Sequence, residues 1–315
     1  MSQRSPSFVV PVSAVGALLV LGVGWAAFSH FRGQAAMAEA RRAALLAVEA
    51  AVVARPADHD ELGRCMAALR KLPDVDTDRE LRLAAARIEL ARDHAELAEE
   101  LCVSLAAEPA ASVAEQRLAA RILLRRHEAD LGDGAAGALR TAQQHSERAY
   151  AVDRLPGDLF RAWLAAMRAE QFEDGKRFAE QLQQQHQDSA EWRFADVVRG
   201  GARTPGLAAV EACAEGLEDL PGEHGAMLAS AQIEAGQLPA AVASADLALG
   251  RAPGLVVVRR VAAVVYHACV LGSPADSVDR ADWVRRRDAQ LDWLERQPRL
   301  DDAQRGKLRQ MREVR

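Results

Sequence analysis

Apolar residues recur at a helical spacing from Ala35 to the C-terminus, with charged and polar residues between them. Short groups of glycine, proline or aspartate interrupt this pattern, and no run alternates apolar and polar residues as a half-buried strand would. The interruptions lie at residues 55–58, 72–76, 108–110, 132–134, 155–158, 200–206, 220–222, 251–254 and 272–276. They leave segments of about 12 to 20 residues, a usual helix length. The pattern predicts an all-α protein.

One stretch of this helical region has a recognisable internal order. A small residue in a first helix is followed by a glycine at a turn, small residues on a second helix and a closing proline. Small side chains let two antiparallel helices approach, the turn needs glycine's freedom, and proline ends the second helix. The stretch resembles a tetratricopeptide repeat. The matching residues are Leu228, Ala229, Gln232, Gly236, Leu238, Ala241, Ala245, Ala248, Leu249 and Pro253.

Other segments match the same motif less completely. Residues 163–182 keep the turn and the second helix, but Trp163 stands where a small residue is expected and Glu170 replaces the glycine. Residues 97–109 and 131–150 match more poorly still. The resemblance implies a tetratricopeptide-like α-solenoid of antiparallel helix pairs over residues 57–275, with C-terminal capping helices over 276–315. A generic α-solenoid with irregular helices would show the same pattern and stays open as an alternative.

The resemblance also implies a binding surface. Tetratricopeptide proteins hold a partner peptide or helix on the concave face, which the first helix of each repeat lines. Carried over residue by residue, the partner-binding groove has two groups of candidates. They are Phe160, Leu164, Met167 and Arg168 in the weaker match, and Glu223, Met227, Ser230, Ile233 and Glu234 in the stronger one. The alternative at each position is an ordinary solvated or packed helix residue.

A membrane anchor is predicted near the N-terminus, after a short tail of residues 1–7. Residues 8–28 form a stretch of 21 residues without a charge, and a helix of that length spans a bilayer's hydrocarbon core of about 30 Å. Trp25 and Phe28 at its end are typical of a membrane interface. A cleaved signal peptide is the alternative, but the apolar run exceeds the usual length for one. We expect a transmembrane helix, followed by a helical linker over residues 29–56.

The side of the membrane on which the helical domain lies follows less directly from the sequence. Arg32, Arg41 and Arg42 follow the span and favour a cytoplasmic domain. A short N-terminal tail with the single Arg4 favours export of the rest of the chain instead. We prefer an extracytoplasmic domain on a single-pass protein of a bacterial inner membrane, with the cytoplasmic arrangement as the alternative.

Composition and charge argue against nucleic acid as a partner. The net charge is −5, from 45 acidic and 40 basic residues that are spread along the whole chain. A nucleic-acid-binding protein concentrates basic residues on one face. Lysine occurs only three times and asparagine is absent, so the arginine content indicates a general compositional bias. We expect protein partners, with no nucleic acid and no small-molecule substrate.

Candidate chemistry is sparse, and each instance has a structural alternative that we prefer. Cys65, Cys102, Cys213 and Cys269 stand far apart among apolar residues, which predicts buried thiols rather than a metal or redox site. His59 lies among carboxylates, but Asp58 next to it is a natural N-cap for a helix. We expect no metal site and no cofactor.

Two longer sequence patterns also have an ordinary interpretation. Residues 132–137 match GxGxxG, yet the charged, helix-period segment before them cannot be the buried strand that a dinucleotide site needs. Residues 255–271 are apolar, but Arg259, Arg260 and His267 interrupt them, which favours a packed helix over a second membrane span.

Without a catalytic motif, the sequence predicts a protein that is not an enzyme. Its expected function is that of a membrane-anchored scaffold or adaptor that helps assemble or stabilise a membrane or envelope complex. Two alternatives remain: a fixed structural subunit of a large membrane complex, and a periplasmic accessory factor in cytochrome or secreted-protein maturation.

Overall fold

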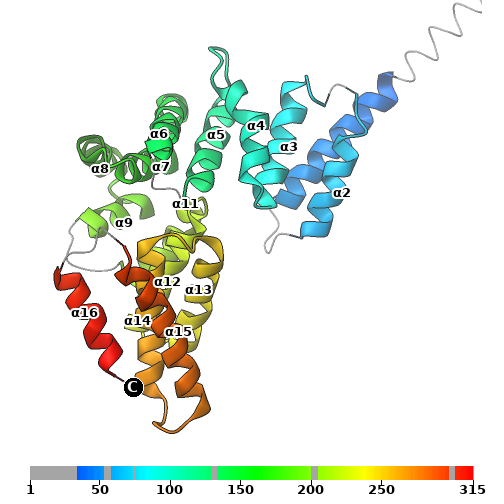
Figure 1. The fold of residues 1–315 in the computed structure, drawn as a ribbon. Coiled ribbons are helices and arrows are strands. Elements are labelled where there is room, and N and C mark those ends of the chain that lie inside the picture. Colours follow the sequence, from blue (N-terminus) through cyan, green and yellow to red (C-terminus); the bar gives the residue numbers. More distant parts are fainter. Residues whose placement is uncertain are drawn as a thin grey trace, which may run out of the picture. The chain divides into compact units, whose positions relative to one another are not determined.

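The computed structural model describes residues 34–52, 58–73, 75–128, 133–199, 205–297 and 302–314 (Figure 1). Within these ranges the regular secondary structure is helical and contains no strand, which confirms the all-α prediction. The chain divides into two compact units, the first ending at Asp93 and the second beginning at His94.

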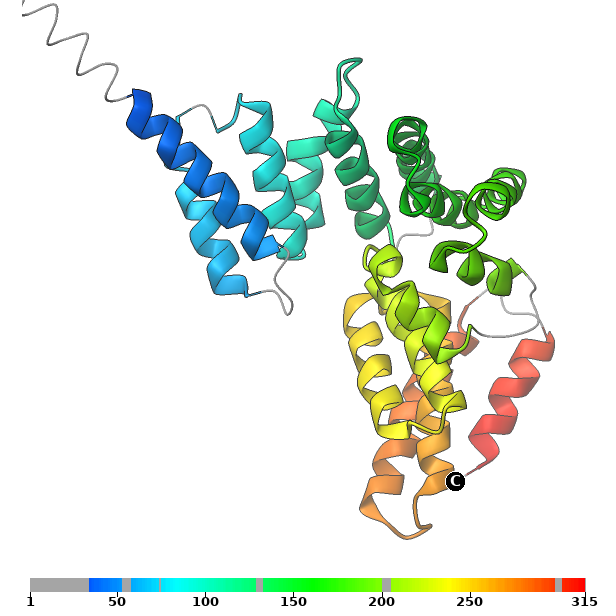
Figure 2. The same cartoon turned by 180° about the vertical axis from the view of Figure 1, so that it is seen from behind.

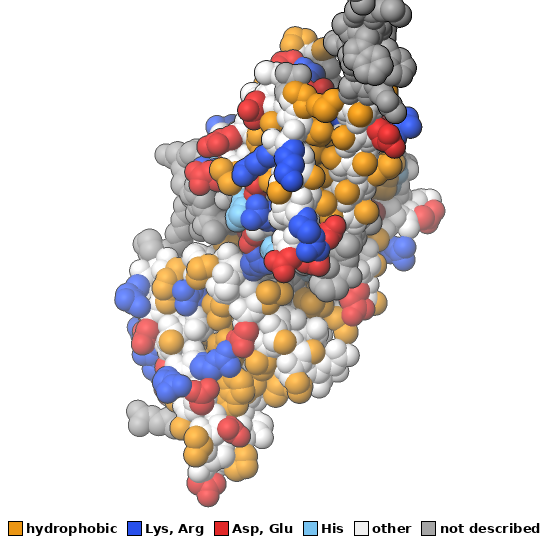
Figure 3. All heavy atoms as spheres, turned by 90° about the vertical axis from the view of Figure 1, so that its right-hand side faces the viewer, with side chains coloured by type: hydrophobic (Ala, Val, Ile, Leu, Met, Phe, Trp, Pro, Cys, Tyr) orange, Lys and Arg blue, Asp and Glu red, His pale blue; other side chains and the backbone are white. Residues whose placement is uncertain are grey.

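The first unit contains a helix over residues 34–52, α2 (His59–Leu69) and α3 (Arg79–Ala91). The Asp58 side chain accepts hydrogen bonds from two backbone N–H groups of α2, which confirms its predicted capping role. Arg41 ties the first helix to the start of α3 through Asp78 and Glu80, with N–O distances of 2.9 and 2.7 Å. Figure 3 looks onto this unit and shows apolar side chains gathered on its surface.

The second unit continues with helix after helix, and most helices pack against the next one along the chain. This architecture of adjacent packed helix pairs is what a stacked array requires. Figures 1 and 2 show the last four long helices before the C-terminal one lying side by side. The elements are α4 (Ala95–Ala106), α5 (Val113–Arg126), α6 (Asp133–Asp153), α7 (Pro156–Arg168), α8 (Phe172–His186), α9 (Ala190–Arg199), α10 (Leu207–Ala212), α11 (Ala214–Leu217), α12 (Pro221–Glu234), α13 (Leu238–Arg251), α14 (Val256–Gly272), α15 (Val278–Glu295) and α16 (Asp302–Glu313).

Small residues set the distance between α12 and α13, as the repeat pattern predicts. Ala229, Ala241, Ala245 and Ala248 are all buried between these helices and their neighbours. A Cβ placed on Gly225 would stand 3.1 Å from the Cβ of Ala248, which is tighter than ordinary contact. The backbones of α12 and α13 therefore approach closely because neither helix presents a large side chain there.

The turn between α12 and α13 has the same backbone conformation as the turn between α7 and α8. The second residue after each preceding helix has a positive φ, which is +74° at Gly236 and +57° at Glu170. In both turns the next residue donates a backbone hydrogen bond to the carbonyl five residues earlier, from Gln237 to Gln232 and from Gln171 to Ala166. The two turns therefore share one backbone geometry, although Glu170 stands where the stronger repeat match has glycine. A non-glycine residue in this conformation costs about 1–2 kcal/mol.

We expect the two turns to respond in opposite directions to exchange of these residues. Gly236→Ala should lower the free energy of unfolding by about 1 kcal/mol because alanine has a Cβ that disfavours positive φ. Glu170→Gly should raise it by up to about 1 kcal/mol, since the relief of strain exceeds glycine's entropic cost. Urea unfolding followed by circular dichroism measures both. Equal effects of the same sign would contradict the shared conformation.

The weaker repeat match differs from the stronger one in how its helices pack. Trp163, where the motif has a small residue, is buried and stacks on Phe160 with ring centroids 5.3 Å apart. Phe194 of α9 meets both rings edge to face. Helices α7 and α9 therefore share an aromatic core.

The single transmembrane helix predicted at residues 8–28 lies outside the described residues. Among the helices of the described ranges, none combines the length and the apolar character that crossing a bilayer demands. The apolar residues 255–271 fall in α14, which packs against α12, α13 and α15. This confirms the packed-helix interpretation of that segment.

Candidate functional site

An apolar hollow of about 310 Å³ lies between α12 and α14. Both helices also pack on α13, which holds them side by side and leaves their outer faces to form the two walls. The positions on each helix are three or four residues apart, a spacing that places side chains on one face. The lining residues are Ala226, Met227, Ser230, Ile233, Val257, Arg260, Val261 and Val264.

The apolar surface continues along α14 beyond the hollow. Val264 is 43% exposed and Leu271 is 62% exposed, although both are aliphatic side chains that burial would stabilise. Val257, Val264 and Leu271 are seven residues apart and therefore lie on one side of the helix. The stripe from Val257 to Leu271 is about 21 Å long at 1.5 Å per residue. We call the hollow together with this stripe the α12–α14 groove.

Two successive arginines on α14 have different environments. Arg259 donates to the carbonyl of Pro253 and to Oε1 of Gln290, both at 2.6 Å, and its guanidinium lies over the Trp293 ring. Arg260 is exposed, lines the groove, and makes no ion pair with any described residue. Arg259 therefore supports the packing of α14 on α15, whereas Arg260 leaves a positive charge available at the groove.

The structure brings together part of the stronger group of predicted binding residues. Met227, Ser230 and Ile233 line the groove, and Glu234 is exposed one residue beyond Ile233. Glu223 instead forms an ion pair with Arg168 of α7, so two predicted residues contact each other as a link between helices. The binding role of all these residues stays a prediction.

The weaker group lies mostly in the protein interior. Phe160 and Leu164 are buried in the core around α7, and Met167 packs against Gly175 of α8. Arg168 also donates to the backbone carbonyl of Glu128. None of these four residues lines the α12–α14 groove, so this groove involves only the stronger repeat match.

The α14 wall of the groove was not among the predicted binding residues. A signal for it was present in the sequence, because residues 255–271 contain valines three, four and seven residues apart. Their apolar character was weighed only as a membrane span or a packed helix. Packing uses one side of α14, with Val258, Ala262 and Val265 buried, and leaves the valine stripe on another side.

A glutamate anchors the start of α12, which forms the other wall. The buried Glu128 accepts a hydrogen bond from the Glu223 backbone N–H at 2.9 Å through Oε1. Burial raises the pKa of this carboxyl to about 7, and the neighbouring Glu223 adds to the shift. The backbone hydrogen bond from Glu223 and the charges of Arg125 and Arg168 oppose this shift. The N-terminus of α12 is thereby held to the chain that follows α5.

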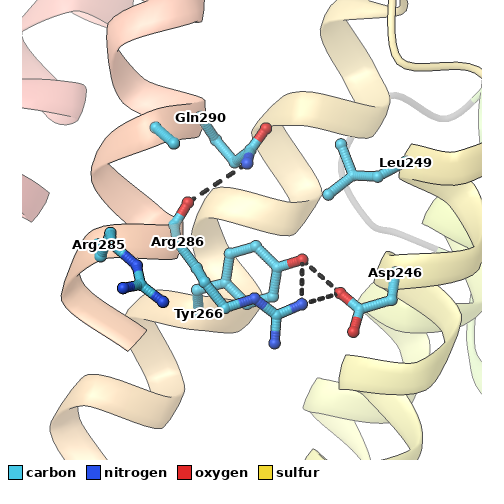
Figure 4. Close-up of a pocket in the computed structure, with 7 residues that line it drawn as sticks. Asp246, Leu249, Tyr266, Arg285, Arg286 and Gln290 are labelled. Carbon is cyan, nitrogen blue, oxygen red and sulfur yellow. Dashed lines mark hydrogen bonds and ion pairs between the residues drawn. The ribbon is translucent and has the colours of Figure 1, made fainter. Parts of the chain in front are cut away.

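A second hollow, of about 470 Å³, lies between α13, α14 and α15 (Figure 4). Its polar groups already satisfy one another. Asp246 accepts hydrogen bonds from the Tyr266 hydroxyl and from Arg286, whose guanidinium lies 4.3 Å from the Tyr266 ring centroid and 4.8 Å from that of Trp283. Burial and the hydrogen bond to Asp246 raise the pKa of Tyr266. This cluster joins three helices and is structural.

The described part of the chain offers few side chains for metal binding or thiol chemistry. No group of three His, Cys, Asp or Glu side chains there is arranged to hold a metal ion. Cys65, Cys102, Cys213 and Cys269 are all free and buried, as predicted. The GxGxxG segment follows α5, and its residues from Asp133 onward belong to α6. A helix therefore precedes these glycines in place of the strand of a dinucleotide site.

The α12–α14 groove is accordingly the best candidate for a functional site. It is apolar, open to solvent along its length, and carries one unpaired charge. No protein-family model matches the chain, and no curated protein matches it either.

Proposed function

We propose that this chain is a tetratricopeptide-like scaffold or adaptor that binds a protein partner in the α12–α14 groove. The observation that carries the proposal is the groove itself, where aliphatic side chains of two helices stay exposed beside each other. Exposed, contiguous apolar surface is characteristic of protein-binding sites. The groove lining includes no carboxylate, imidazole or thiol, which supports binding rather than catalysis.

The proposed setting is a membrane. The uncharged residues 8–28 would tether the helical domain and raise its effective concentration near other membrane proteins. Helping to assemble or stabilise a complex in a bacterial inner membrane is therefore the proposed role, with the helical domain on the extracytoplasmic side. Binding of this kind needs no chemical step, because affinity comes from burial of the aliphatic side chains.

A photo-cross-linking residue at Val264 tests the groove in the intact membrane protein. We expect it to yield one predominant cross-linked membrane protein on illumination of living cells. The same probe at Val278, which is 86% exposed at the start of α15, should yield none of that product. Ser230→Arg, on the facing wall, should abolish the Val264 product by filling the groove. Identical products from both probe positions would overturn the proposal.

The strength of the interaction gives a second measurement on the same surface. Val264→Asp should weaken binding of the cross-linked partner about 10- to 100-fold, because burying a valine contributes roughly 1.5–3 kcal/mol. Val278→Asp is the matched control and should leave the affinity unchanged. Thermal unfolding of both variants should agree with the unsubstituted protein, since both side chains are exposed.

A further inference from the structure

The shape of the α12–α14 groove restricts the form of its occupant. Two helices lie side by side and form straight walls, and the aliphatic stripe of α14 runs for about 21 Å. A helix of about 14 residues has this length. An amphipathic helix sets its apolar side chains into such a groove every three or four residues.

Charge on one rim of the groove restricts the occupant further. Successive residues of a helix are rotated by about 100° around its axis. Arg260 therefore lies between two faces of α14. One face carries the groove residues Val257 and Val264, and the other carries Val256 and Ala263. The latter face belongs to a hydrophobic cluster with Leu291 and Leu294 of α15, which Leu308 of α16 joins. Arg260 therefore stands at the edge of the apolar groove, next to a face of α14 that is covered by packing.

Helix α16, which packs on α15, also has an excess of basic residues. Its basic residues are Arg305, Lys307, Arg309 and Arg312, against the acidic residues Asp302 and Glu313. Arg312 pairs with Asp292 of α15, but Lys307 and Arg309 are exposed and form no ion pair with described residues. Arg260 is the charged side chain that lines this otherwise apolar groove.

We infer that the groove takes an amphipathic helix of the partner protein that places an aspartate or glutamate against Arg260. The inference rests on the proposed function and specifies the chemistry of the partner. The apolar face of the incoming helix covers Val257, Val261, Val264 and Leu271, and its acidic flank faces the Arg260 rim. Complementary charges at a rim select the partner and its orientation, while burial supplies most of the affinity.

Three synthetic peptides test this requirement. Each is a labelled helix of about 18 residues with the same leucine and alanine face, and the three differ only in having Glu, Gln or Lys at one flanking position. Binding to the full-length protein in nanodiscs is measured by fluorescence anisotropy. We expect the Glu peptide to bind about fivefold more tightly than the Lys peptide, as for a partly exposed ion pair. Raising the salt concentration should reduce this difference.

Charge reversal identifies the responsible side chain. Arg260→Glu should reverse the order of the Glu and Lys peptides, and Arg260→Gln should abolish the difference between them. Arg285→Glu is the matched control, because Arg285 is exposed on α15 and lines the other hollow. It should leave the order unchanged.

The inference and the proposed function fail separately. The inference is overturned if Arg260→Glu does not change the order in which the three peptides bind. In that case Val264→Asp would still weaken the binding of all three peptides if the groove binds helices. Failure of every peptide to bind would also overturn the inference. The Val264 cross-linking experiment decides the proposed function independently of any peptide.

Discussion

Asp219→Ala should lower the free energy of unfolding by about 3–5 kcal/mol, the largest effect we expect from removing one charged side chain. Asp219 is 3% exposed and accepts hydrogen bonds from Nε of Arg121 at 2.9 Å and Nε of Arg161 at 3.2 Å. These arginines belong to α5 and α7, whereas Asp219 precedes α12. Its removal leaves buried positive charge without a full complement of partners, which is the costly way to break a buried pair.

Guanidinium chloride unfolding at neutral pH measures this loss, and an exposed aspartate is the control. Asp282 pairs with Arg285 one turn away on α15, where the side chains of Arg285 and Asp282 are 80% and 42% exposed. Asp282→Ala should change the stability by less than about 1 kcal/mol. An equally small effect of Asp219→Ala would show that the buried pairs contribute nothing to holding α12 against α5 and α7.

The same aspartate is one member of a longer series of buried charges. Arg117 donates to Asp158 at 2.7 Å, Asp158 lies 3.4 Å from Arg161, and Arg161 reaches Asp219. Hydrogen bonding to Asp158 raises the pKa of Arg117 further, although burial opposes the shift. Arg117 therefore stays charged at any accessible pH. Carboxylates on α7 and before α12 compensate this charge from within the fold.

This network could not be predicted from the sequence. The arginines were interpreted as a compositional bias, and their partners lie far along the chain: Arg121 and Asp219 are separated by 98 residues. Helical periodicity identifies pairs three or four residues apart, but it contains no information on pairs that form only after helices stack. The capping role of Asp58 was predictable for the opposite reason, since its partners are two and three residues away.

Helix boundaries show the same division between local and non-local causes. The turn at Gly236 was predicted from its glycine. The break at Arg92–His94 was missed because it contains neither glycine nor proline, although Asp93 has a φ of +68°. Aspartate tolerates this conformation better than most residues, because its short side chain can hydrogen-bond locally. Composition alone does not distinguish such a residue from an ordinary helical one.

The sequence predicted the residues of one wall of the candidate groove but not those of the other. Its α12 wall followed from the tetratricopeptide resemblance, which placed Met227, Ser230 and Ile233 on one face. Its α14 wall depends on which side of that helix the neighbouring helices cover, and this is a property of the assembled array. The aromatic core around Phe160 has the same origin, because α9 had no place in the repeat pattern and yet closes over α7.

Phe160→Ala should lower the free energy of unfolding by about 3–5 kcal/mol, the usual cost of removing a buried phenylalanine ring. The ring of Phe160 is completely buried and contacts Trp163 and Phe194 at centroid distances of 5.3 and 5.7 Å. Gly216 lies directly against this ring, because a Cβ there would stand 2.9 Å from it, and a glycine has no side chain that could fill the vacated space. Met227→Ala, at a half-buried position in the groove, should cost less than about 1.5 kcal/mol.

The comparison of these two variants separates a core position from a binding position, both of which the repeat motif had placed in the groove. In thermal unfolding, Phe160→Ala should lower the midpoint strongly, whereas Met227→Ala should lower it only slightly. At a temperature where both variants are folded, partner cross-linking at Val264 should be retained by Phe160→Ala and reduced by Met227→Ala. Reduced cross-linking in folded Phe160→Ala would mean that the binding surface extends to α7. A large loss of stability in Met227→Ala would mean that this side chain belongs to the core, and that the groove is shallower than its aliphatic lining indicates.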